Sequence, residues 1–129
     1  MLEIRAMGVE PADTIAFLRR REATRQRELD ARFDAAWEDF DRIVEMIVRE
    51  FAPARIWQWG SLLHRRHFSL RSDIDIGVEG LGRAERLFEL HARAEALTVF
   101  PLHIVELERI EPEYACLIRN PGRLVHGVR

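Results

Sequence analysis

A helical stripe in the first half of the chain raises a length problem that any fold must solve. Apolar residues recur at steps of three and four, the spacing of one helix face: Leu29, Phe33, Trp37, Phe40, Ile43 or Val44, Ile47 and Phe51. Pro11 suits a first helical turn and Pro53 ends the helix. A helix over residues 11–51 would be about 60 Å long, against about 30 Å for a small domain. The helix therefore either breaks near residues 19–28 or projects from the body.

We expect residues 1–28 to form an N-terminal helical arm and residues 29–129 to form the folded domain. A projecting arm would expose Ile15, Phe17 and Leu18, which would favour a partner protein or a second copy of the chain. The arm also carries the cluster Arg19–Arg27. This cluster is either a solvated helix face paired with its neighbouring glutamates, or a contact surface for RNA, phosphate or an acidic partner.

Composition narrows the class of protein. The chain has 129 residues, enough for one domain, and its 47% apolar content is enough for a core. The net charge of −2 argues against nucleic acid as a general partner. All 20 basic residues are arginine, so lysine chemistry is excluded. No apolar run predicts a membrane span, residues 1–5 lack the apolar core of a signal peptide, and Cys116 has no other cysteine to pair with, so we expect a cytoplasmic protein.

The second half of the chain predicts a small sheet with helices packed on it. Strand patterns run over residues 55–59, 72–78 and 102–107, and helical patterns over 83–97 and from Pro112 to about residue 119. The expected fold class is therefore α+β, with a three-stranded mixed sheet.

Two short motifs on this sheet carry the chemistry. Gly60-Ser61 follows the first strand, where glycine permits close approach of a phosphate and serine offers a hydroxyl. Asp73 and Asp75 share a strand face about 7 Å apart, and such a carboxylate pair suits Mg²⁺. The insert between the two motifs contains Arg65, Arg66, Arg71 and Ser72 and no acid, as a site for a metal–triphosphate complex would require.

From about Phe40 to the C-terminus, this arrangement resembles the minimal nucleotidyltransferases of the DNA polymerase β superfamily. The resemblance implies that Gly60 and Ser61 bind ATP or another nucleoside triphosphate. Because the insert is cationic, we expect the same nucleotide to be bound by Arg65, Arg66, Arg71 and Ser72. It implies that Asp73 and Asp75 are catalytic and bind Mg²⁺, in a site that can hold two metal ions. It also implies transfer of a nucleoside monophosphate to an acceptor. Small members of the family resemble antitoxins of toxin–antitoxin pairs, whose HEPN-class partner protein is the acceptor.

The sequence departs from the family pattern after Gly60-Ser61 and on the last strand. Leu62 and Leu63 replace the small residues that the family has there, and His103 replaces a third carboxylate. A histidine can accept a proton or bind metal, but it adds no negative charge. Two functions remain open: a nucleotidyltransferase with His103 as a catalytic residue, or a weakened or inactive module of the same fold that neutralises a partner protein.

Overall fold

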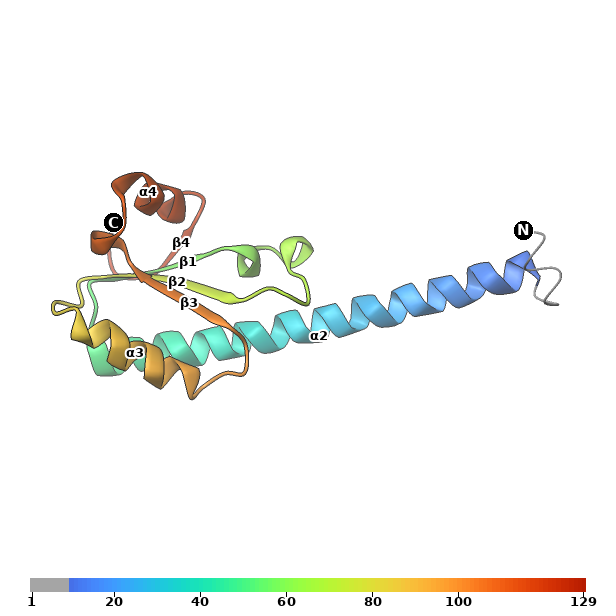
Figure 1. Cartoon of the computed structure of the whole chain (residues 1–129), viewed down its shortest axis with the longest axis horizontal. Coiled ribbons are helices and arrows are strands. Elements are labelled where there is room, and N and C mark those ends of the chain that lie inside the picture. Colours follow the sequence, from blue (N-terminus) through green and yellow to red (C-terminus); the bar gives the residue numbers. More distant parts are fainter. Residues whose placement is uncertain (1–9) are drawn as a thin grey trace.

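The computed structural model describes residues 10–129, which form an α+β body with one long projecting helix (Figure 1). The helices are α2 (Pro11–Phe51), α3 (Glu85–Glu95) and α4 (Pro112–Arg119). The strands are β1 (Arg55–Trp59), β2 (Ile74–Glu79), β3 (Leu102–Glu106) and β4 (Arg123–His126). None of the described helices is long and apolar enough to cross a membrane.

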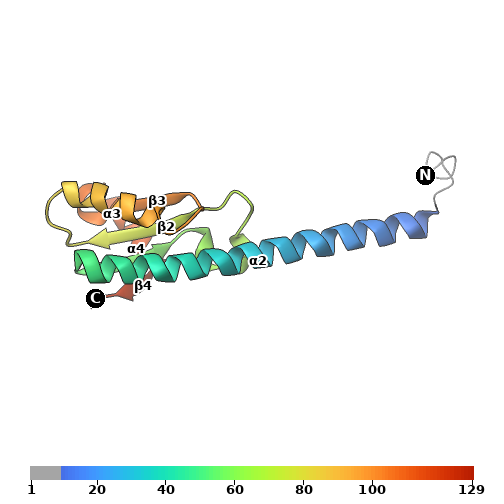
Figure 2. The ribbon, with the colours of Figure 1, turned by 90° about the horizontal axis from the view of Figure 1, so that it is seen from below.

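The α2 helix does not break near residues 19–28 but projects from the body. Its 41 residues run continuously from Pro11 to Phe51, and the N-terminal half extends away from the body (Figures 1 and 2). Side chains of α2 become buried from Phe33 onward, where the helix reaches the sheet. The boundary expected between residues 28 and 29 thus falls inside one continuous helix, close to where the helix leaves the body. Residues 1–9 of the expected arm lie outside the described residues.

The sheet has four strands in the order β3-β2-β1-β4, not the three expected. β1 pairs antiparallel with both β2 and β4, and β2 pairs parallel with β3, so the sheet is mixed as predicted. The strand that the sequence pattern missed is β4, which has only the four residues Arg-Leu-Val-His after the turn at Asn120-Pro121-Gly122. Four residues are too few to establish a period, so the pairing with β1 becomes visible only in the fold.

The two faces of the sheet carry different cores. On one face, Ile74, Ile76 and Val78 pack against α2 and α3 in the main core. On the other face α4 covers a smaller cluster around Trp57, Leu107 and Ile118. Gly77 makes this close packing possible, because a Cβ there would lie 3.2 Å from Leu107 and 3.3 Å from Ile118. The part of this face that α4 leaves uncovered carries the residues described next.

Candidate functional site

Two predicted site residues, Asp75 and His103, form one row across the sheet with Trp59, the residue before Gly60. Trp59 of β1 is the register partner of Asp75 in β2, and Asp75 is the register partner of His103 in β3. Ile74 and Ile76 point into the main core, so Asp75 between them points to the opposite face. The row lies at the end of the sheet from which α2 projects, beyond the area covered by α4 (Figure 1).

Gly60 brings the Gly-Ser turn directly against this row. Its backbone has φ 81° and ψ −163°, a region open almost only to glycine. A Cβ at this position would lie 2.0 Å from Oδ2 of Asp75. The backbone of the turn and the Asp75 carboxylate are therefore neighbours, and Ser61 starts a 3₁₀ turn (Ser61–Leu63) immediately after them.

The two aspartates bring two carboxylates close together, one of them buried. Asp75 is buried, while Asp73, just before β2, is half-buried. Burial raises the pKa of Asp75 to about 7, and the neighbouring Asp73 carboxylate raises it further in the same direction. A bound cation would offset both causes, because it would stabilise the charged form of both groups.

His103 forms the solvent-facing rim of the site. Its Nδ1 lies 3.4 Å from Oδ1 of Asp75, and its side chain is 55% exposed. The imidazole packs edge-on against the Trp59 ring with 5.1 Å between ring centroids. The buried indole Nε1 of Trp59 has no hydrogen-bond partner among the described residues.

The structure directs Arg65 to α2. Its guanidinium lies 3.1 Å from Asp30 and 2.6 Å from Asp34, and 4.4 Å over the ring of Phe33. The hydrogen bonds to Asp34 and then Asp30 raise its pKa. Arg65 thus attaches the insert to α2. The structure therefore does not place its charge beside Asp73 and Asp75, where the sequence predicted it.

The remaining members of the insert are placed in two ways. Arg66 and Arg71 are exposed, and their side chains have no hydrogen bond or ion pair among the residues described. Ser72 is buried, and its Oγ accepts a 2.8 Å hydrogen bond from the backbone N–H of Ser69. Ser72 therefore shapes the turn that leads into Asp73, while the two arginines are free to approach a ligand.

One buried carboxylate on this face was missed in the sequence. Glu79 of β2 accepts hydrogen bonds from the Trp57 indole and from Arg55, both at 2.8 Å, and from Arg119 at 2.8 Å. Burial raises its pKa, but these hydrogen bonds outweigh burial and lower it to about 2. The signal that could have found it is the even spacing of the three acids, because Asp75 follows Asp73 by two residues and Glu79 follows Asp75 by four, which puts all three on one strand face.

The acid at position 106 stays away from the row. Glu106 is buried on the other face of β3, and its Oε2 accepts a 2.9 Å hydrogen bond from Arg109. Within residues 10–129, no group of three or more His, Cys, Asp or Glu side chains is arranged to hold a metal ion. Any cation at the row would therefore take part of its coordination from water or from a ligand.

Comparisons of the chain with protein-family models, with curated proteins and with solved structures find no match.

Proposed function

We propose that the protein is a Mg²⁺-dependent nucleotidyltransferase of the DNA polymerase β superfamily. It would move a nucleoside monophosphate, AMP when ATP is the donor, onto an acceptor. The observation that carries this proposal is the contact between Gly60 and Asp75, where a Cβ would lie 2.0 Å from the carboxylate. A turn suited to phosphate oxygens thus abuts a carboxylate suited to the cation that accompanies them.

The donor set supports Mg²⁺. Asp73 and Asp75 offer hard oxygen ligands, and the pKa of Asp75 is raised by burial and then by the Asp73 carboxylate, which a bound cation would offset. Mg²⁺ is commonly held by one or two carboxylates, with substrate phosphates and water completing its shell. When bound, Mg²⁺ would stabilise negative charge on the phosphates of the nucleotide. The resemblance allows a second ion at the same carboxylates.

The chain's own residues have separate roles in this proposal. The Gly60-Ser61 turn would hydrogen-bond the triphosphate, and Arg66 and Arg71 would neutralise it. The acceptor oxygen forms a bond to the α-phosphorus while the bond from that phosphorus to the bridging oxygen breaks, and pyrophosphate leaves. The acceptor proton would pass to the His103 ring nitrogen that does not face Asp75.

We place the acceptor on another protein, in the manner of a toxin–antitoxin pair with a HEPN-like partner. A second candidate is a module of the same fold that neutralises its partner without transfer. One observation favours it: His103, which adds no negative charge, stands beside Asp75 where the family that the chain resembles has a carboxylate.

A labelling experiment separates the two candidates. The protein is incubated with Mg²⁺, α-³²P-ATP and the purified product of the adjacent gene, beside the Asp73→Asn/Asp75→Asn variant and an Asp41→Asn control on the exposed face of α2. The enzyme proposal predicts label on the partner with the wild type and the control, and at least about tenfold less with the double variant. A stable complex with the adjacent protein and no label would support the neutralising module instead.

A further inference from the structure

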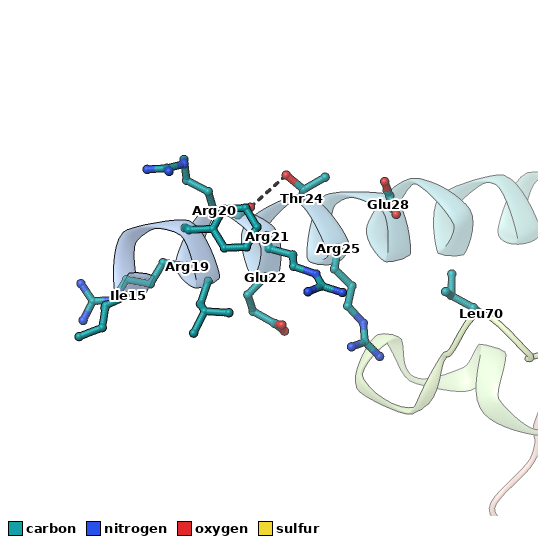
Figure 3. A pocket seen from close by; sticks show the side chains of 11 residues that line it. Ile15, Arg19, Arg20, Arg21, Glu22, Thr24, Arg25, Glu28 and Leu70 are labelled. Carbon is teal, nitrogen blue, oxygen red and sulfur yellow. Dashed lines mark hydrogen bonds between the residues drawn. The ribbon is translucent and has the colours of Figure 1, made fainter. Parts of the chain in front are cut away.

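We infer that the groove between the projecting part of α2 and the insert loop is a docking site for an acidic amphipathic helix of a partner protein. This groove, called the arm groove below, is formed by Ile15, Arg21 and Arg25 of α2 together with Leu70 (Figure 3). Leu18 of α2 also lines it. The hollow has a volume of about 1020 Å³. The inference does not depend on the proposed transfer reaction.

The apolar part of the arm groove continues the face of α2 that packs on the sheet. Ile15 and Leu18 lie on the same helix face as Leu29 and the buried residues Phe33, Ala36 and Phe40. The three-and-four positions between Leu18 and Leu29 are the charged residues Glu22 and Arg25. Beyond the body this face has no covering element among the described residues, so Ile15 and Leu18 are 50% and 52% exposed. Leu70, 53% exposed, faces the same hollow from the loop. Large apolar side chains gathered on one helix face in this way indicate a binding surface.

The charge of the arm groove defines its occupant. Four arginines and two glutamates line the groove, namely Arg19, Arg20, Arg21, Arg25, Glu22 and Glu28. None of these arginines makes an ion pair within residues 10–129. By contrast, Arg65 of the neighbouring loop is neutralised by Asp30 and Asp34. A partner segment with carboxylates beside Arg21 and Arg25, and apolar residues against Leu18 and Leu70, complements both properties of the surface.

Two other occupants fit less well. Two copies of the chain joined through their arm grooves would bring two arginine clusters together, and like-charge repulsion opposes that contact. A nucleic acid would satisfy the arginines but would leave Ile15 and Leu18 without an apolar partner. A helix is the natural occupant because its side chains at three-and-four spacing match the spacing along α2.

The arm groove lies close in sequence to the candidate site on the sheet. Leu70 precedes Asp73 by three residues, so the insert loop connects the groove to the carboxylate pair. A partner helix lying on the arm would therefore sit beside the open end of the sheet (Figure 1).

The test uses a defined probe in place of an unidentified partner. The probe is a fluorescein-labelled peptide of about three heptads, with leucine at the a and d positions and glutamate on the flanks, and the control peptide has lysine in place of glutamate. Fluorescence anisotropy measures binding to the full chain, to Arg21→Glu/Arg25→Glu and to Leu18→Ser. Two matched variants remote from the arm serve as controls: Arg83→Glu, at an exposed arginine, and Leu117→Ser, on the exposed face of α4.

We expect the acidic peptide to bind the wild type at least about tenfold more tightly than the lysine peptide. Both arm variants should weaken binding by at least about tenfold, while the two controls stay within about twofold of the wild type. Equal binding of the two peptides, or arm variants that bind like the wild type, would overturn the inference. Circular dichroism establishes that each variant folds.

Three further results would overturn the inference by naming another occupant. Light scattering that shows a dimer of the wild type and a monomer of Leu18→Ser would assign the groove to a second copy. A rise of at least about tenfold in peptide affinity on deletion of residues 2–9 would assign it to the chain's own N-terminal segment. Single-stranded RNA that binds more tightly than the acidic peptide, and is unaffected by Leu18→Ser, would assign it to nucleic acid.

Discussion

Replacing Asp75 by asparagine removes a buried charge whose cost depends on pH. The carboxyl of Asp75 has a pKa of about 7 in the folded protein, raised from 3.8 by burial and then by the Asp73 carboxylate. Between these two values the folded protein binds more protons than the unfolded chain. Stability therefore falls as pH rises from about 4 to about 7, and the charged Asp75 destabilises the fold most above pH 7.

The size of this effect follows from the linkage relation. A shift from 3.8 to about 7 corresponds to about 4 kcal/mol of destabilisation at alkaline pH, and about 2.5 kcal/mol of it develops between pH 5 and pH 8. Asparagine keeps the shape of the side chain and does not ionise. The stability gained on substitution should thus be larger at pH 8 than at pH 5 by about this amount.

Urea denaturation of the wild type and Asp75→Asn at both pH values measures the gain directly. Asp41→Asn, at an exposed acid of α2, is the matched control and should show no such pH dependence. Added Mg²⁺ should stabilise the wild type at pH 8 and should not stabilise Asp75→Asn. A gain that is equal at the two pH values would refute the account of Asp75 as a buried charge opposed by its neighbour.

Three other substitutions test the same face of the sheet. Gly60→Ala should destabilise the protein by the strain of a positive φ, about 1–3 kcal/mol, and further by the clash of the new Cβ with Asp75. Gly82→Ala is the matched control, because Gly82 has φ 91° but no atom within 4 Å of an added Cβ, so it should lose stability through strain alone. Equal losses of stability in thermal unfolding would contradict the close contact between Gly60 and Asp75. Glu79→Gln should lose about 1–3 kcal/mol at neutral pH, because two half-exposed arginines lose their buried partner. The pKa of Glu79 is lowered from 4.5 to about 2, so the wild type should be more stable than Glu79→Gln by the full amount above pH 4.5. This difference in unfolding free energy, measured by urea titration, should vanish as pH falls to about 2. A difference that does not change with pH would argue against the ion-pair network. His103→Asp should tighten Mg²⁺ binding in calorimetry and lower the rate of label transfer, since it adds a carboxylate and removes the proposed proton acceptor; a faster rate would contradict that role.

The helices and the first three strands could be predicted from the sequence, because each has a period long enough to detect. The stripe from Leu29 to Phe51 matches the buried face of α2, and the strand patterns match β1, β2 and β3 within one or two residues at each end. The sequence also posed the choice between a broken and a projecting helix. It could not resolve that choice, because no helix-breaking residue occurs between Leu18 and Leu29 and only the packed body shows where the helix leaves the sheet.

The candidate site was predictable in its residue types and only partly in its arrangement. The alternation of strands brought Asp75 and His103 to one face, and the register between β2 and β3 then made them neighbours. The direction of Arg65 was not predictable, because it depends on Asp30 and Asp34, which lie more than thirty residues earlier in the chain.

The central claim is that Gly60, Asp73 and Asp75 form a site for a metal–nucleotide complex. Isothermal titration of α,β-methylene-ATP into the full chain tests it most directly, in Mg²⁺ and in EDTA, with Asp73→Asn/Asp75→Asn beside the Asp41→Asn control. The account predicts binding by the wild type and the control in Mg²⁺, weakened at least about tenfold by EDTA or by the double substitution. No binding by the wild type, or equal binding by the double variant, would contradict it.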